Sequence, residues 1–342
     1  MNSYEFDVTI LGGGCIGVSI FAELTRRGFG NVGLVDQGRK TNSATAHSGG
    51  ILRVFHENAE HVELALRNRA RLELYRKARV LSPETSANGS LYFFNKLRYA
   101  DYHPNLKRMD IAQYPFEVLT STCGQKLHPE FHWTDQEWAI YEPLGSQLSP
   151  ITFVGELCES SVINGGSVVD NFKVHRISRY RNQFRLSGEV ANVTTPLLIL
   201  AGGAGMLPQI KALGLNLPLE AKTLTTYTGR KIDSSADLPN YFDRETLDYA
   251  RLGGGPEVIL AQPDSQRILN PRWRGPFEKK CAEDCYAPDR RGYLGQVAGV
   301  PQLMIATGWG GTGFKFALEI GKRIADAVEQ ARPERRKAYV QF

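Results

Sequence analysis

Two glycine-rich turns, one near each end of the chain, constrain the fold more than any other feature. The first, Gly12-Gly13-Gly14-Cys15-Ile16-Gly17, follows the apolar run Val8–Leu11, and the second, Gly308–Gly313, follows Leu303–Thr307. Each turn joins a predicted strand to a predicted amphipathic helix. It therefore aims unpaired backbone N–H groups and the positive end of a helix dipole at one point. Both turns predict a site for an electron-rich ligand group.

The first turn has the spacing of a dinucleotide-binding fingerprint. Gly12, Gly14 and Gly17 lie between a strand and a helix predicted over 15–28, a second strand follows at 31–36, and Asp36 ends that strand. In this βαβ unit the glycines allow a tight turn and close backbone approach to a pyrophosphate, while the acid accepts from a ribose hydroxyl. With a second such turn near the other end, one cofactor held at both of its ends is expected. FAD is long enough for that.

Composition bounds the class of protein. A chain of 342 residues with 42% apolar content can bury a sizeable core in about two domains. A net charge of +5 without a basic block predicts no nucleic-acid partner, and apolar runs of strand length predict no membrane span. Five cysteines, odd in number and without a CxxC pair, predict a reduced, cytoplasmic compartment and no metal.

The alternation of strand and helix patterns predicts an α/β fold, with a Rossmann-type parallel sheet and an interleaved, antiparallel-β-rich cap domain. The predicted FAD-binding domain is discontinuous (1–80, 143–218 and 291–332), the cap comprises 81–142 and 219–290, and 333–342 form a tail. Helices are expected over 60–79, 152–164 and 313–330, where Pro333 ends the last. Strands are expected over 167–172 and 195–201, a meander over 174–193, and β-rich segments over 91–142 and 219–290.

Small hydroxyl residues and glycines at 41–53 can pass close to a pyrophosphate and a flavin ring. With this loop, the chain resembles the D-amino-acid oxidase superfamily of FAD-dependent oxidoreductases, most closely its sarcosine and glycine oxidase branch. The resemblance rests on five segments: Gly12 to Asp36, His47–Arg53, Glu142–Pro150, Leu198–Ala204 and Gly308–Phe316.

The resemblance implies which residues contact FAD. They are Gly12, Gly14, Cys15, Ile16, Gly17, Asp36, Gln37, Ser43, Thr45, His47, Ser48, Gly49, Gly50, Val174, Ala201, Gly202, Gly308, Gly310, Gly311, Thr312, Gly313, Phe314 and Lys315. Sarcosine oxidases attach the flavin through a cysteine near the 284–289 turn. Here Cys281 and Cys285 both miss the expected offset from Asp289, so noncovalent FAD is expected.

The residues expected to bind the substrate differ from those of the sarcosine and glycine oxidase branch. The lysine that holds a substrate carboxylate is present as Lys315, but the partner arginine is replaced by His56. Arg53 is either catalytic or a structural residue that pairs with a loop carboxylate. Four further residues of the cap are candidates for the pocket wall: Tyr227, Tyr249, Arg251 and Arg267.

We therefore expect an FAD-dependent oxidoreductase that oxidises the C–N bond of an amine or amino-acid-like substrate, by hydride transfer to flavin N5 with reoxidation by O2. Because the usual carboxylate-binding arginines are missing, weak activity on glycine and sarcosine is expected. The same departure favours an alternative, a tailoring or maturation enzyme acting on a large or protein-borne amine. A non-catalytic FAD-binding protein is a third possibility, against which Lys315 beside the flavin argues.

Overall fold

A six-stranded sheet forms the centre of one half of the molecule. The computed structural model describes residues 2–38, 43–83, 89–189, 191–231, 238–253, 257–269 and 273–331. The sheet has the order β19-β20-β13-β2-β3-β9, and only the β19–β20 pair is antiparallel. Its strands are β2 (Val8–Leu11), β3 (Val32–Val35), β9 (Ser167–Val169), β13 (Leu198–Leu200), β19 (Tyr293–Val297) and β20 (Val300–Thr307).

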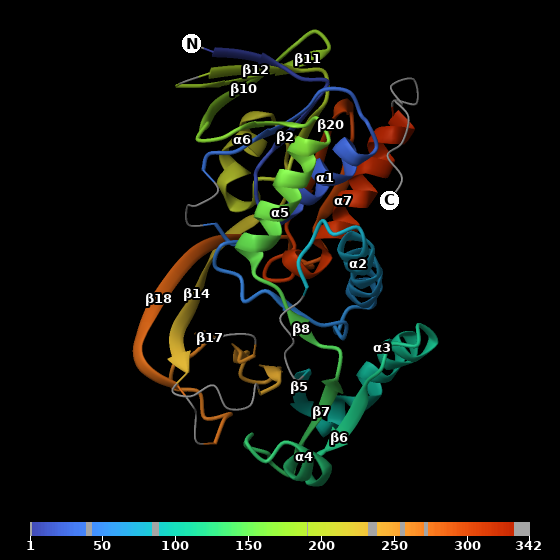
Figure 1. Ribbon diagram of the computed structural model, residues 1–342, viewed down its shortest axis with the longest axis vertical. Helices are drawn as coiled ribbons and strands as arrows, with labels where there is room; N and C mark the ends of the chain where they lie inside the picture. Colours follow the sequence, from blue (N-terminus) through green and yellow to red (C-terminus); the bar gives the residue numbers. More distant parts are fainter. Residues whose placement is uncertain are drawn as a thin grey trace.

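Alternate residues of the central strands face opposite layers, so this sheet is buried on both sides. Ile10, Ile199 and Met304, which are in register, belong to the core shared with four helices: α1 (Cys15–Arg26), α2 (Ala59–Lys77), α5 (Pro150–Ile163) and α7 (Gly313–Ala331). Leu11 and Leu200 pack instead on the other layer, which contains β1 (Asn2–Glu5), β10 (Val174–Tyr180), β11 (Gln183–Gly188), β12 (Ala191–Thr195), η2 (Gly203–Met206) and α6 (Leu207–Ala212). Figure 1 shows both layers in the upper half of the molecule.

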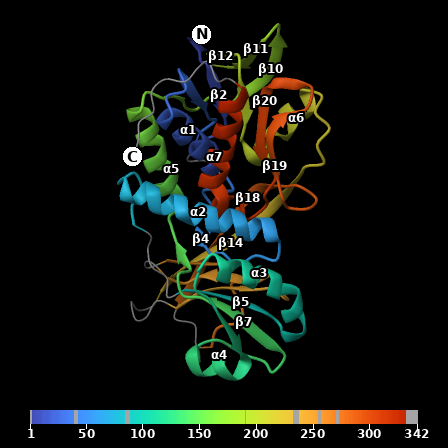
Figure 2. The same cartoon turned by 90° about the vertical axis from the view of Figure 1, so that its right-hand side faces the viewer.

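The other half is built on an eight-stranded sheet of order β18-β14-β17-β16-β15-β5-β7-β6. Its strands are β5 (Ser90–Asn95), β6 (Glu117–Thr120), β7 (Glu137–Glu142), β14 (Glu220–Lys231), β15 (Asn240–Asp243), β16 (Tyr249–Arg251), β17 (Glu257–Leu260) and β18 (Trp273–Tyr286). In Figure 1 the long strands β14 and β18 curve from the upper half into the lower one. Figure 2 shows α2 lying across the molecule where the two halves meet. A two-stranded ribbon of β4 (Ile51–Leu52) and β8 (Ser146–Gln147) completes the strands.

The expectation of a β-rich segment over 91–142 was incomplete. After the short η1 (Lys96–Arg98), this segment contains two helices, α3 (Tyr99–Ile111) and α4 (Ser121–Leu127). Helix α3 includes Pro104 and is largely polar, but its buried residues Tyr102, Leu106 and Met109 recur at helical spacing. Pro104, a helix-breaking residue inside the helix, obscures this pattern in the sequence.

The other predicted helices and strands are present in the structure, but several begin or end at other residues than expected. The four expected helices are present as α1, α2, α5 and α7, and the meander over 174–193 is formed by β10 to β12. The strand expected over 167–172 stops at Val169, and the one expected over 195–201 comprises only Leu198–Leu200. Pro333 and the predicted tail lie outside the described residues, and the domain boundaries stay a prediction. No described helix combines the length and apolarity needed to cross a lipid bilayer.

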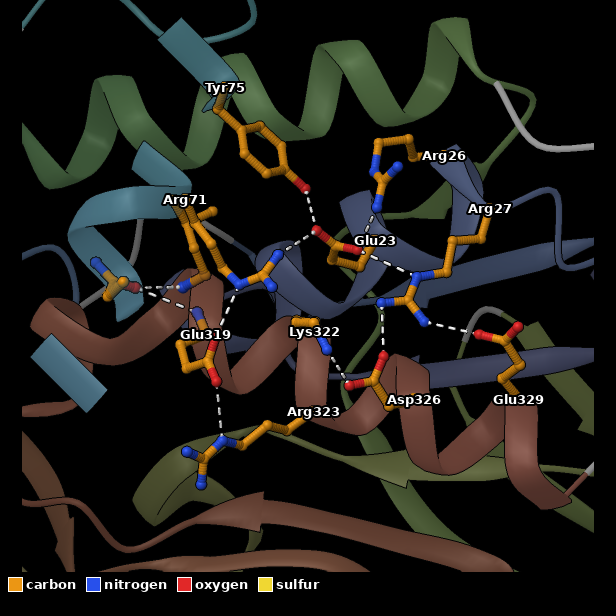
Figure 3. A network of polar contacts seen from close by, with 12 residues as sticks. Glu23, Arg26, Arg27, Arg71, Tyr75, Glu319, Lys322, Arg323, Asp326 and Glu329 are labelled. Atoms are coloured by element: carbon orange, nitrogen blue, oxygen red, sulfur yellow. Dashed lines mark hydrogen bonds and ion pairs between the residues drawn. The ribbon is translucent and has the colours of Figure 1, made fainter. Parts of the chain in front are cut away.

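Buried ion pairs join α1, α2 and α7 (Figure 3). Glu23, whose side chain is 1% exposed, contacts Arg26 at 2.8 Å, Arg27 at 3.2 Å and Arg71 at 3.5 Å, and accepts from Tyr75 Oη at 3.0 Å. Burial alone raises the pKa of Glu23, but the three arginines outweigh it and hold the pKa below its ordinary value. The carboxylate is therefore charged. Arg27 and Arg71 extend the network to α7, where they pair with Asp326, Glu329 and Glu319.

Candidate active site

A cavity of about 1370 Å³ extends between the two halves. Its wall combines both glycine-rich turns, the loop 43–53 and the start of α2 from one half with strands of the eight-stranded sheet from the other. The carboxyl ends of parallel strands β2, β3, β13 and β20 open into it, which is where ligands bind in open α/β sheets.

The first turn needs glycine for packing as well as for ligand approach. Gly12 has φ +117°, and a Cβ there would collide with the backbone of Gly202. A Cβ on Gly17 would collide with the carbonyl oxygen of Gly12, so helix α1 could not approach the turn. Gly14 caps α1 without any side-chain hydrogen bond, and Cys15 N–H donates to Thr45 Oγ1 at 3.1 Å. Gly14, Cys15 and Ile16 line the cavity, so the start of α1 faces it.

The second turn is held against β18. Gly310 N–H donates to the carbonyl oxygen of Cys285 at 2.9 Å, and Gly311 N–H donates to Asp284 Oδ2 at 2.5 Å. Gly308, Gly310 and Gly311 all have positive φ, and Tyr286 leaves no room for a Cβ on Gly310. The turn therefore runs close along the cavity, and α7 starts from it.

Two cations, Lys315 and Arg53, are neighbours on this wall, since both line a small void beside α2. Lys315 Nζ donates to Gly311 O at 3.3 Å, and burial, reinforced by Arg53, lowers the pKa of Lys315 to about 7. No described loop carboxylate lies at ion-pair distance from Arg53, so the structural one of its two expected roles is not found. Its guanidinium lies over the rings of Tyr92 and Phe242, 5.2 and 5.3 Å from their centroids, and donates to Phe55 O. Within the described part of the chain, neither cation has a carboxylate at ion-pair distance. Burial lowers the pKa of both, and this is opposed from longer range by Asp284 at Lys315 and by Glu142 and Glu57 at Arg53.

Two buried histidines lie beside these cations. The rings of His56 and His61 are 5.7 Å apart, and both pack against Phe316 at 5.2 and 5.1 Å. Their Nε2 atoms have no hydrogen-bond partner among the described residues. Burial, with Arg53 and Lys315 nearby, holds the pKa of His56 well below its usual range. At neutral pH the imidazole that replaces the expected arginine is therefore uncharged.

Most residues predicted to contact the cofactor lie on the cavity wall. They are Gly12, Gly14, Cys15, Ile16, Asp36, Gln37, Ser43, Thr45, Ser48, Gly49, Gly50, Ala201, Gly202, Gly308, Gly310, Gly311, Thr312, Gly313, Phe314 and Lys315. Of the proposed catalytic residues, Arg53, His56 and Tyr249 also lie there.

Other predicted residues lie elsewhere. Gly17 supports the turn from behind, His47 Nδ1 lies 3.1 Å from the Ser43 carbonyl oxygen, and the carbonyl of Val174 accepts from Gln209 at 3.1 Å. Arg251 is outside the lining; burial lowers its pKa, and Glu257 nearby opposes this.

Two more cap candidates are corrected. Arg267 is held by Glu137 at 2.7 Å and by Asp243, and Tyr227 packs in the cap core. Sequence reasoning missed Tyr92 and Phe242 on the wall. Asp284, the first residue of the 284–289 turn that the resemblance singled out, also lines the cavity.

The residues present fit a dinucleotide. The two turns leave helix starts open toward one cavity, and Asp36 lies beside the first turn, where a Cβ on Gly13 would come within 2.8 Å of its carboxyl carbon. Such turns bind pyrophosphate through backbone N–H groups. The fold and the two turns are therefore those of a dinucleotide-binding protein. A family model described as "FAD dependent oxidoreductase" matches residues 7–327, so the chain belongs to that family.

Known relatives agree with this assignment. Mitochondrial sarcosine dehydrogenases of Mus musculus and Homo sapiens are 22% identical over 374 residues, which cover 96% of this chain but only 40% of those proteins. Glycine oxidase from Geobacillus kaustophilus is 18% identical with a TM-score of 0.81, covering 99% of this chain and 97% of that one. L-proline dehydrogenase from P. horikoshii is 15% identical with a TM-score of 0.83, covering 98% and 96%. The predicted superfamily and fold class are confirmed.

Proposed function

We propose that this chain oxidises the C–N bond of a small amine that carries a carboxylate. The observation that carries the proposal is the pair of adjacent cations, Arg53 and Lys315, which line the cavity and form no ion pair with any described carboxylate. Asp284 acts on Lys315, and Glu142 and Glu57 act on Arg53, but burial outweighs these carboxylates and lowers both pKa values. A ligand carboxylate in direct contact would therefore stabilise both cations. Sarcosine, glycine and proline, named in its relatives, are all amines of this kind.

The chain's own residues would divide the work. The two glycine turns and Asp36 would hold FAD, which when bound supplies N5 as hydride acceptor, with O2 as the final electron acceptor. Arg53 and Lys315 would bind the substrate carboxylate and orient the carbon that is oxidised. Their positive charge also disfavours an ammonium group nearby, so the substrate would react as the neutral amine.

The cysteines support noncovalent FAD. Cys281 is exposed and outside the cavity lining, while Cys15 and Cys285 line the cavity. Burial raises the pKa of Cys15 to about 11 and also raises that of Cys285, so both stay protonated thiols rather than nucleophilic thiolates. Acid precipitation of the purified holoprotein should release yellow FAD. Flavin retained in the pellet would contradict this part of the proposal.

The function is tested by mixing holoprotein anaerobically with a panel of amines and amino acids, watching flavin absorbance, and then admitting O2. Bleaching by a carboxylate-bearing amine and recovery on aeration are expected. Lys315→Met should slow bleaching, while Lys107→Met, on the exposed face of α3, should not. If small amines fail but an amine carried on a peptide bleaches the flavin, the tailoring alternative is favoured. If no amine bleaches it, the chain is not an amine oxidoreductase.

A further inference from the structure

Three aromatic residues stand side by side across the cap sheet. Tyr92 of β5 is the register partner of Phe242 of β15, and Phe242 is in turn the partner of Tyr249 of β16. Directly opposed residues of neighbouring strands point to the same face of a sheet. All three line the cavity, and the rings of Tyr92 and Phe242 are stacked with centroids 5.3 Å apart. We call these three residues the aromatic row.

The aromatic row faces the loop that carries Arg53. The guanidinium of Arg53 lies over Tyr92 and Phe242, and a Cβ on Gly49 would come within 3.9 Å of Tyr249 Cε2. The row is therefore next to the site where Arg53 and Lys315 would hold a carboxylate. A substrate substituent that points toward the cap would contact the aromatic row.

The charges beside the aromatic row are already neutralised. Arg244, directly after β15, forms an ion pair with Glu57, and Tyr92 Oη donates to the same carboxylate at 2.5 Å. Because Arg244 and Glu57 satisfy each other, this wall offers no free charge to a second ionic group of a ligand. An apolar group is the chemistry that it fits.

Leu247 lies two residues before Tyr249, in a strained backbone conformation. It lines the cavity, its side chain is 55% exposed, and its φ is +59°, a conformation that leucine rarely adopts. The turn that carries it is fixed: Asp243 Oδ1 accepts from the N–H groups of Glu245 and Thr246 at 3.0 and 3.2 Å, and Arg267 holds Asp243. Backbone strain that the surroundings maintain is found preferentially at functional sites.

We propose that the turn between β15 and β16 selects the substrate, and that Leu247, with Phe242 and Tyr249, binds a bulky apolar substituent of the amine. The proposal rests on the proposed function, since it takes the substrate carboxylate to be held by Arg53 and Lys315. It adds the substrate class: amines with an aliphatic ring or branched chain beside the carboxylate, in preference to glycine or sarcosine.

Two carboxylates without nitrogen test the proposal by equilibrium binding, because neither can be oxidised. Holoprotein is titrated with acetate and with cyclohexylacetate, and binding is monitored by the change in the flavin absorbance spectrum. The two titrations give the ratio of the Kd values. We expect cyclohexylacetate to bind roughly tenfold or more tightly than acetate, since several buried CH₂ groups contribute. Leu247→Asn keeps the side-chain size and tolerates positive φ, whereas Leu247→Gly removes the side chain without strain. Both should reduce the ratio about fivefold or more.

The control is Leu144→Asn, since Leu144 is 44% exposed and lies outside the cavity lining. It should leave the ratio unchanged. Equal binding of both carboxylates, binding of neither, or an unchanged ratio in both Leu247 variants would overturn the inference. The anaerobic amine panel reports separately on the proposed function: bleaching by small amines with no preference for bulky ones would reject only the role of Leu247.

Discussion

The backbone N–H of Gly13 donates to Asp36 Oδ2 across 2.6 Å, which joins the first glycine turn to the end of β3. The other carboxylate oxygen, Oδ1, accepts from Gly38 N–H at 2.8 Å. Asp36 therefore holds the backbone of the turn in place as well as facing the cavity. A carboxylate oxygen has more than one lone pair, so a ribose hydroxyl can still donate to it.

Asp36→Ala should weaken FAD binding by about 1–3 kcal/mol, because it removes a charge-assisted contact and frees the turn. Equilibrium dialysis of the apoprotein against FAD measures this change. Asp7→Ala is the matched control, since Asp7 also accepts from a backbone N–H, that of Asn31 at 3.0 Å, but lies outside the cavity lining. Equal FAD affinity in wild type and Asp36→Ala would leave Asp36 without a role in binding.

Lys315 should make the binding of anions depend on pH. With its pKa lowered to about 7, the ammonium is charged below that pH and neutral above it. The Kd of acetate for the holoprotein should therefore rise as pH increases through about 7. Lys315→Met should bind acetate about 10- to 100-fold more weakly at pH 6, with no such rise. If the Kd of acetate still rises near pH 7 in Lys315→Met, another group is responsible for the pH dependence.

His56→Ala should have a smaller effect than Lys315→Met. Since the His56 imidazole is neutral and its Nε2 has no partner among the described residues, its loss removes at most one neutral hydrogen bond to the substrate, about 0.5–1.5 kcal/mol. Anaerobic stopped-flow rates of flavin bleaching should fall by no more than about tenfold. The pH profile between 6 and 9 should keep its shape, because the pKa of His56 lies well below that range. Disappearance of a break in this range would contradict the assignment of a neutral ring.

Glu23→Gln should destabilise the fold by about 1–3 kcal/mol at pH 7, because a neutral amide no longer balances Arg26, Arg27 and Arg71. The loss is limited because Arg27 keeps Asp326 and Glu329 as partners and Arg71 keeps Glu319. The folded-state pKa of Glu23 lies below its ordinary value, so its contribution is fully present above about pH 4.5 and is lost as pH falls through the folded value. Urea unfolding at pH 7 and at pH 4 should show the variant and wild type converging in acid. Glu63→Gln, in the exposed pair with Arg67, should change stability by less than about 1 kcal/mol. An equal effect of both substitutions would contradict the argument from burial.

The part of the site formed by residues close together in the sequence could be predicted from the sequence. Gly12, Gly14 and Asp36 lie within one βαβ unit, so their spacing already defines their geometry. Lys315 follows directly from the second turn for the same reason. Such short-range relations depend on turn and helix geometry, which a single stretch of sequence determines.

The substrate half could not be predicted, because it depends on pairings between distant strands. Tyr92 and Phe242 become neighbours only through the parallel register of β5 and β15, and nothing in either segment specifies the other as its partner. Arg267 illustrates the converse error. An arginine in the cap could equally line a pocket or form an ion pair, and only the folded arrangement of Glu137 and Asp243 decides that it is structural.

The position of β20 and α7 in the sheet has a consequence for synthesis on the ribosome. β20 lies between β13 and β19, and the turn after it supplies one wall of the cavity. A nascent chain that has already folded its cap and its first glycine turn still lacks that wall until residues up to Lys315 have emerged. We therefore expect the cofactor to bind only when synthesis of the chain is nearly complete. A prematurely terminated chain would expose apolar strand edges, which chaperones and proteases recognise.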